Sequence, residues 1–243
     1  RMFLNHEENS PLRHNCSGKH TGMLAQALFF GDPTIDYINP AHTVQQRILR
    51  AFSEMTGIPP QQIILGVDGC SAPVFAVPLR AAAMAFARLA DPSALPEPRR
   101  QALRRIFKAM VAHPDMVAGF NSFDTDLMLA GSGSILTEGG AEGYQALAFL
   151  PGACGEGSPA LGIALKISDG DLGQASRSKR IASIAHDGGG RARSTVTVET
   201  LRQLGALNPT QLEALKDIQA TAQHDFPAVI GGDVAVVAGA GGV

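Results

Sequence analysis

The sequence predicts an α+β fold, in which a mainly helical half is followed by a half that mixes strands and helices. Before residue 131, apolar residues recur at the spacing of helices. From Gly131 onward, glycine-rich turns alternate with short apolar runs that are typical of antiparallel strands. Helical spacing then returns after residue 196. We find no internal repeat, and we expect one domain over 1–243, with a helical part (1–130) and a part with the sheet and the last helices (131–243).

Local signals place the first two helices. An apolar run closed by a glycine predicts a helix over 19–30, with Ser17 as its cap. Asn39 and Pro40 then supply a cap and a first-turn proline for a second helix, which stops at Gly57.

The spacing of apolar residues and the turn signals between them predict the remaining helices and strands. A short buried strand is expected at 63–65, and the pair Asp68-Gly69 predicts a turn directly after it. Helices are predicted over 78–89, 98–111, 197–204 and 211–222, and strands over 134–136, 145–150 and 161–167.

Composition excludes several classes of function. The net charge is −2, and lysine and arginine are scattered, so the sequence lacks the basic stripe that nucleic-acid binding requires. One arginine-rich stretch has the spacing of a solvated helix face, and it contains Arg99, Arg100, Arg104 and Arg105. No apolar run approaches the roughly 20 residues of a membrane helix, and no signal peptide is recognisable. We therefore expect a cytoplasmic protein whose partner is a small molecule.

Reactive side chains are concentrated in residues 15–22, which read N-C-S-G-K-H-T-G. A thiol, a hydroxyl, an amine and an imidazole lie here within five positions, at the expected start of a helix. A second cysteine, Cys70, follows the Asp68-Gly69 turn. The chain has three cysteines, which are too few and too odd in number for a disulfide framework. The function is therefore sought in these two segments.

Metal binding is one interpretation of this pattern. Cys16 and Lys19 are separated by two residues, so both side chains can converge at a helix start, and Cys70 can complete the set from the facing turn. Two thiolates and one nitrogen leave a fourth position free, as in an open zinc site. Lysine is an unusual ligand because it must first lose its proton. The alternative, two buried cysteines near an exposed lysine, remains open on spacing alone.

Other chemistries fit less well. Ser17 could act as a nucleophile with Lys19 as its base, but residues at i and i+2 do not face each other on a helix. Ser176 and Lys179 have S-x-x-K spacing, but they lie in a polar stretch that predicts a surface loop. A phosphate-binding loop is disfavoured because Arg13 stands where that motif requires glycine, and His20 stands where it requires serine or threonine.

Four blocks of sequence, in order, resemble the L-asparaginase II family of the Rhizobium etli type. They are H-N-C-S-G-K-H-T-G-M-L (14–24), D-G-C-S-A-P (68–73), M-V-A-H-P-D-M-V-A-G (110–119) and G-G-A-E-G (139–143). The resemblance implies a hydrolase that converts L-asparagine to L-aspartate and ammonia. It also implies a fold similar to that of serine β-lactamases and glutaminases.

The resemblance further implies a zinc ion held by Cys16, Lys19 and Cys70, which organises the pocket and binds substrate. His20 and Asp68 adjoin these ligands and are the candidate catalytic residues of this chain. We also expect a homodimer.

The sequence departs from the family pattern at three points. The family's nucleophilic serine lies in an R-S-x-x-K segment and a supporting serine in a C-A-S segment, both upstream of C-S-G-K, and neither occurs here. We therefore expect that an N-terminal portion is missing and that this fragment is inactive or nearly so. A family lysine falls at Glu138, which makes a non-catalytic zinc-binding or regulatory relative the competing hypothesis. Residues 172–190 are interpreted as an insertion without a catalytic role.

Overall fold

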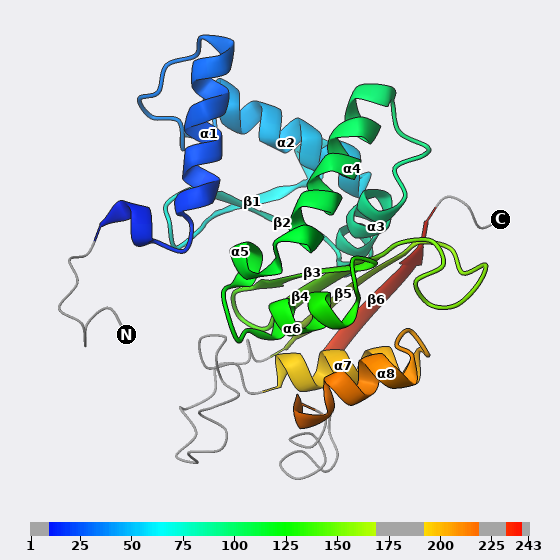
Figure 1. Cartoon of the computed structure of the whole chain (residues 1–243). Coiled ribbons are helices and arrows are strands. Elements are labelled where there is room, and N and C mark those ends of the chain that lie inside the picture. The colour runs from blue at the N-terminus through cyan, green and yellow to red at the C-terminus, as the bar shows by residue number, and fades with distance from the viewer. Residues whose placement is uncertain (1–9, 169–191, 219–231, 240–243) are drawn as a thin grey trace. The chain divides into compact units, whose positions relative to one another are not determined.

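The computed structural model describes residues 10–168, 192–218 and 232–239 (Figure 1). The chain divides into two compact units: unit 1 contains residues 1–54 and 58–77, and unit 2 contains residues 55–57 and 78–243. The described residues form helices and antiparallel sheets, so the predicted α+β class is confirmed. The expectation of a single domain stays a prediction. Within the described ranges, no helix has the length and apolar character needed to cross a membrane.

Unit 1 combines helices with a two-stranded hairpin. Its elements are η2 (Pro11–Arg13), α1 (Ser17–Phe30), α2 (Thr43–Thr56, whose last two residues belong to unit 2), η3 (Pro60–Gln62), β1 (Ile64–Val67) and β2 (Pro73–Ala76). The strands pair antiparallel, with Val67 opposite Pro73 next to the loop. Helix α1 ends as the sequence predicts, because Gly31 adopts the left-handed conformation (φ 70°) that favours glycine.

The predicted start of α2 is wrong. Asn39 and Pro40 precede the helix, which begins at Thr43. The Asn39 side chain accepts a hydrogen bond from the backbone N–H of Ala41 (2.9 Å), which stabilises a turn. The first helical N–H groups find another acceptor, since His42 Nδ1 accepts from the backbone N–H of Val44 (3.2 Å). The Asn39-Pro40 pair therefore forms a turn that precedes α2 and does not cap the helix.

The prediction of a buried strand near residue 63 is also wrong in part. Ile63 is buried, but it precedes the strand, and the four residues of β1 are all exposed, with 70% exposure at Ile64 and 80% at Val67. A hairpin of only two strands cannot enclose a core between its own faces, so its apolar side chains are not covered by the hairpin itself.

Unit 2 is built on a four-stranded antiparallel sheet. Its described elements are α3 (Leu79–Ala90), α4 (Glu97–Ala112), α5 (Pro114–Ala118), α6 (Phe123–Ala130), β3 (Ile135–Gly140), β4 (Tyr144–Phe149), β5 (Leu161–Ile167), α7 (Arg193–Gln203), α8 (Pro209–Ala214) and β6 (Gly232–Ala238). The strand order is β3-β4-β5-β6, and every neighbouring pair is antiparallel.

Helices cover both faces of this sheet. On one face, Leu127 of α6 and Leu201 of α7 pack with Ile135, Leu147 and Phe149 of the sheet. On the opposite face, apolar residues of α3 and α4 pack with the alternate strand positions, among them Ala90, Phe107, Leu136 and Ala148. The alternation of side chains along each strand thus fills two core layers.

Most predicted elements of unit 2 are confirmed. The helices expected over 78–89 and 98–111 correspond to α3 and α4, and the three expected strands correspond to β3, β4 and β5. The helix expected over 211–222 begins earlier, at Pro209, because Asn208 and Gln211 form a capping box, and α8 ends at Ala214. Residues beyond 218 of that expected helix, and the 172–190 segment with Ser176 and Lys179, lie outside the described residues.

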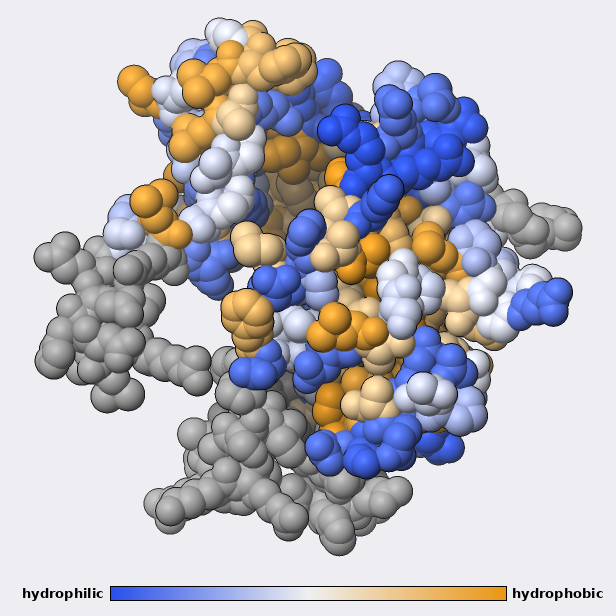
Figure 2. Space-filling model, in the orientation of Figure 1, coloured by the Kyte–Doolittle hydropathy of each residue, from blue (hydrophilic) through white to orange (hydrophobic). Residues whose placement is uncertain are grey.

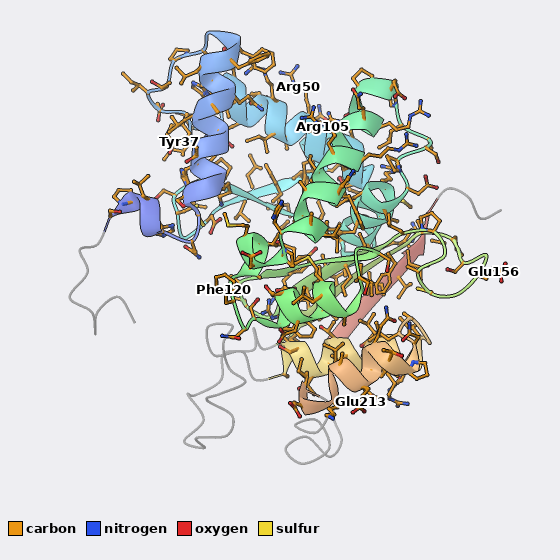
Figure 3. All side chains as sticks on the ribbon, viewed as in Figure 1. Tyr37, Arg50, Arg105, Phe120, Glu156 and Glu213 are labelled. Atoms are coloured by element: carbon orange, nitrogen blue, oxygen red, sulfur yellow. The ribbon has the colours of Figure 1, made fainter. Side chains whose placement is uncertain are left out.

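The arginine-rich stretch lies on α4, which is strongly hydrophilic in Figure 2. Arg104 and Arg105 are exposed, and Arg100 forms an ion pair with Glu97 one turn earlier (2.7 Å). Figure 3 shows Arg105 on this helix. This arrangement is that of a solvated helix face.

Strand β5 packs closely against the backbone of α3. A Cβ atom at Gly162 would lie 1.9 Å from the carbonyl oxygen of Ala83 and 2.4 Å from the backbone nitrogen of Ala87. Both atoms belong to helix backbone, so neither can move without moving α3. A side chain at position 162 would therefore separate the helix from the sheet.

We predict that Gly162→Ala lowers the free energy of unfolding by about 3 kcal/mol, the upper part of the range for overpacked cores. Urea denaturation followed by circular dichroism measures this change. The matched control is Gly22→Ala in α1, where a Cβ meets no atom within 4 Å. This control should stabilise the helix by about 0.5–1 kcal/mol. An unchanged urea midpoint for Gly162→Ala would contradict the close packing.

Candidate metal centre

The first half of the candidate site is the start of α1. Cys16 occupies the N-cap position, and its backbone carbonyl accepts a hydrogen bond from the backbone N–H of His20 (3.1 Å). The backbone N–H of Cys16 donates to His14 Nδ1 (3.0 Å). The prediction that Ser17 caps this helix is therefore wrong: Ser17 is the first helical residue, and the cap side chain makes no capping hydrogen bond. With Cys16 at the cap, its thiol is available for other chemistry.

The second half is the loop between β1 and β2. The backbone N–H of Asp68 donates to the carbonyl of Ala72 (2.8 Å), and that of Ser71 donates to the carbonyl of Asp68 (2.9 Å). Ser71 adopts a left-handed conformation (φ 66°), and the Asp68 carboxylate accepts from the backbone N–H of Gly69 (2.6 Å). The predicted turn is thus present, and Cys70 lies within it.

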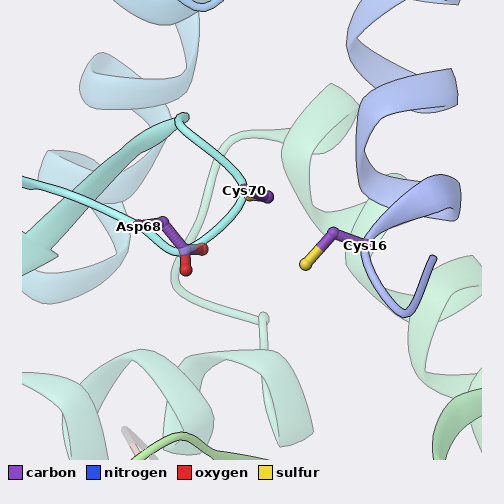
Figure 4. Close-up of side chains that lie close together, drawn as sticks. All are labelled: Cys16, Asp68 and Cys70. Atoms are coloured by element: carbon purple, nitrogen blue, oxygen red, sulfur yellow. The ribbon is translucent and has the colours of Figure 1, made fainter. Parts of the chain in front are cut away.

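The two halves meet at three side chains. The sulfur atoms of Cys16 and Cys70 and a carboxylate oxygen of Asp68 all lie within 4.8 Å of one another. Figure 4 shows Cys16 approaching from the start of α1, and Asp68 and Cys70 from the hairpin loop. Each of these residues is half-buried. Lys19 joins them, since its Nζ atom donates to Asp68 Oδ2 at 2.7 Å.

Apolar packing holds the loop against the helices. Ala72, which follows the loop, is buried with Met23 and Ala27 of α1 and Val44 of α2, and Cys70 packs at the edge of this cluster. The loop position is therefore fixed by burial of apolar surface. The Lys19–Asp68 ion pair is more exposed, and pairs of this kind contribute little to stability.

The charges of the site influence one another. Partial burial raises the pKa of the Cys16 thiol, and a hydrogen bond between Cys16 and Cys70 that favours the protonated Cys16 adds to this shift, while the Lys19 charge opposes it. For Lys19, burial favours the neutral amine, but hydrogen bonds with Asp68 and Cys70 prevail and raise its pKa. The Lys19 hydrogen bond lowers the pKa of Asp68, against the effect of burial. In this arrangement Lys19 is a cation that pairs with Asp68.

His20 lies beside these residues but points to a different partner. Its Nδ1 atom shares a hydrogen bond with the hydroxyl of Tyr37 (2.6 Å), and the two rings meet edge to face. Figure 3 marks Tyr37 near α1. The other ring nitrogen, Nε2, is buried without a hydrogen-bond partner among the described residues. His20 therefore does not join the cluster of Cys16, Asp68 and Cys70.

The donor atoms of the cluster suit a zinc ion. Thiolates are soft ligands that select zinc, and nitrogen or carboxylate oxygen commonly completes such a set. Two sulfur atoms, a carboxylate and an amine converge here from two segments that are far apart in the sequence. Asp68, which the sequence indicates as a catalytic candidate, is thus placed among the potential ligands.

Glu138, in unit 2, lies in a second polar group. Desolvation by the surrounding protein raises its pKa to about 7; the charge of Asp124 adds to the shift, and Arg193 opposes it. The residue as a whole is nevertheless exposed to solvent, which weakens the effect of this desolvation. The Arg193 guanidinium and the Asp124 carboxylate both lie against Gly139, where a Cβ would be 1.7 Å from the first and 2.9 Å from the second.

Buried hydrogen bonds fix this second group. Asp124 accepts from the hydroxyl of Thr137 (2.8 Å) and from the side-chain amide of Gln145, and all three residues are buried. Sequence reasoning missed these residues and Tyr37. Polar residues within apolar strands, as at Thr137 and Gln145, are the signal that could have revealed them, because buried polar groups require partners.

One comparison with known proteins identifies the family. The family model described as L-asparaginase II matches residues 1–182, which is well over half of the chain. The chain belongs to the L-asparaginase II family. No curated protein sequence matches it. Membership in this family indicates a hydrolase, and a small molecule is the substrate expected of an asparaginase family.

Glu138 generates a prediction about stability and pH. Because its folded pKa of about 7 lies above the ordinary 4.5, the folded protein binds more protons than the unfolded chain between these values. Its stabilising contribution is therefore complete below pH 4.5 and is lost as the pH rises to about 7. After allowance for solvent screening, we expect a loss of about 1 kcal/mol.

Glu138→Gln should remove this dependence. Urea denaturation at several pH values between about 4.5 and 8 measures it, and the wild type should lose more stability across this window than the variant. Glu156→Gln is the matched control, because Glu156 is exposed on the loop between β4 and β5 (Figure 3). Equal pH profiles for Glu138→Gln and the wild type would refute the raised pKa.

Proposed function

We propose that this protein carries the zinc-binding part of an amidohydrolase site. The reaction of that site is the conversion of L-asparagine to L-aspartate and ammonia. The observation that carries the proposal is the convergence of two sulfur atoms and a carboxylate oxygen, from Cys16, Cys70 and Asp68, within 4.8 Å of one another. Lys19 is hydrogen-bonded to Asp68 beside them. Family membership supplies the reaction class, because an asparaginase hydrolyses a side-chain amide. We further propose that the protein acts in the cytoplasm as a homodimer.

The proposed zinc ligands are Cys16, Lys19 and Cys70. A bound zinc ion would organise the pocket and polarise a substrate oxygen. Lys19 must release its proton before it can act as a ligand. In the structure its ammonium group donates a hydrogen bond to Asp68. In this proposal Asp68 orients Lys19, and the packing of Ala72 keeps the two cysteines together. His20 lies outside the proposed ligand set and shares a hydrogen bond with the hydroxyl of Tyr37.

A second candidate function is a non-catalytic zinc-binding or regulatory role. Glu138 favours it, because a carboxylate stands where the resemblance places a lysine, and an amine base cannot be replaced by a carboxylate without reversing the charge. The neighbouring Asp124 and Arg193 already form a buried polar group around this position. A gain of asparagine binding in Glu138→Lys, when the wild type has none, would favour this second function.

The zinc site is tested by metal analysis. After dialysis against zinc at low concentration, we expect about one zinc per chain in the wild type and at least tenfold weaker binding in Cys16→Ala and Cys70→Ala, because each removes a thiolate ligand. Cys154→Ala is the matched control, since this half-buried cysteine lies in unit 2 and should not affect zinc. Undiminished zinc in both ligand variants would refute the assignment.

The substrate is tested by two measurements on the zinc-loaded protein. Calorimetric titration should detect binding of L-asparagine, and this binding should be lost in Cys70→Ala. Ammonia release should stay near background, because the 243 residues contain no R-S-x-x-K or C-A-S segment to supply the attacking serine. Robust ammonia release would show that those segments are dispensable, whereas the absence of both binding and turnover would contradict the asparaginase proposal.

A further inference from the structure

The thiols of Cys16 and Cys70 have a second possible chemistry, which requires no metal. We propose that these two residues are a redox modification site, at which a low-molecular-weight disulfide oxidises them to an intramolecular disulfide. The inference concerns the regulation of the proposed zinc site. The cross-link itself, however, rests only on the positions of the two cysteines.

The distance between the sulfur atoms supports the proposal. They lie within 4.8 Å of each other, although they come from the start of α1 and from the β1–β2 loop. Both cysteines are half-buried, so each keeps some access to solvent. In Figure 4 the Cys16 side chain extends from the helix start toward the loop that carries Cys70.

The backbone around both residues allows the remaining approach. Cys16 is the cap of α1 and lies before its regular turns, and Cys70 lies in a hairpin loop. A Cβ at the neighbouring Gly69 would meet no atom within 4 Å, so the loop has open space beside it. Formation of the disulfide requires a short movement of this loop, which brings the sulfur atoms to the bonding distance of about 2 Å.

The third cysteine of the chain does not share this environment. Cys154 differs, because it lies in unit 2 and packs against the apolar core. Cys16 and Cys70 both belong to unit 1, and their sulfur atoms lie within 4.8 Å of each other.

The chemistry is ordinary thiol–disulfide exchange. The thiolate of Cys16 attacks one sulfur of oxidised glutathione, forms a mixed disulfide and displaces one glutathione thiolate, which takes up a proton. The Cys70 thiolate then attacks the sulfur of Cys16 and displaces the second glutathione. Two protein thiols are oxidised, one glutathione disulfide is reduced to two thiols, and the balance is complete.

This cross-link would control metal binding. A disulfide sulfur no longer offers the thiolate that zinc requires, so the oxidised protein cannot use Cys16 and Cys70 as ligands. Conversely, bound zinc would protect both sulfur atoms from oxidation. Reduction with dithiothreitol should restore the metal-binding form.

The experiment uses the Cys154→Ser variant, which retains only the two relevant thiols. Metal-free protein is incubated with oxidised glutathione, and intact-mass analysis, thiol titration and peptide mapping follow. We expect the loss of both free thiols, a mass decrease of two hydrogen atoms, no retained glutathione and a peptide that joins Cys16 to Cys70. Dithiothreitol should reverse each change, and wild-type protein should form the same link.

Single variants provide the controls. Cys70→Ser should retain glutathione on Cys16, because no second thiol can displace it, and Cys16→Ser should retain it on Cys70. Stable mixed disulfides in Cys154→Ser, or links only between separate chains, would overturn the proposal. If the cross-link forms but zinc neither binds nor slows it, the redox site stands and the proposed zinc function fails. If zinc binds but the cross-link does not form, the proposed zinc function stands and the redox site fails.

Discussion

The packing of Ala72 against Met23, Ala27 and Val44 is the contact on which the candidate site depends. It attaches the end of the hairpin loop to two helices and so determines where Cys70 lies relative to Cys16. The ion pair between Lys19 and Asp68 is partly exposed and adds orientation more than stability. Unit 1 thus separates two tasks: apolar burial fixes the position of the backbone, and polar contacts adjust the reactive groups on it.

Much of the fold could be predicted because its helices and strands produce local patterns in the sequence. The apolar spacing in α3 and α4 and the turns that separate β3, β4 and β5 are local signals, and the structure contains these elements. The errors arose where two local signals compete. Asn39 can cap a helix or close a turn, and here it closes a turn. Ser17 precedes an apolar run as a cap residue would, but Cys16 takes the cap position.

The candidate site could be predicted in composition but not in geometry. The spacing of Cys16, Lys19 and Cys70 indicated a ligand set, whereas the position of Asp68 beside Lys19 and the cysteines depends on how the hairpin folds back onto α1. The polar group around Glu138 could not be predicted from the sequence for the same reason. Asp124, Gln145 and Arg193 come from three separate elements, and no local pattern connects them.

Gly139 shows how a residue without a side chain can determine the charge of its neighbours. The space that a methyl group would fill is occupied by the Arg193 guanidinium, which lies close to the Asp124 carboxylate. Any larger residue would expel this cation, leave a buried carboxylate uncompensated and remove the influence that opposes the raised pKa of Glu138. The protonation of Glu138 therefore depends partly on the absence of a side chain at position 139, and relatives that carry another residue there must balance these charges in some other way.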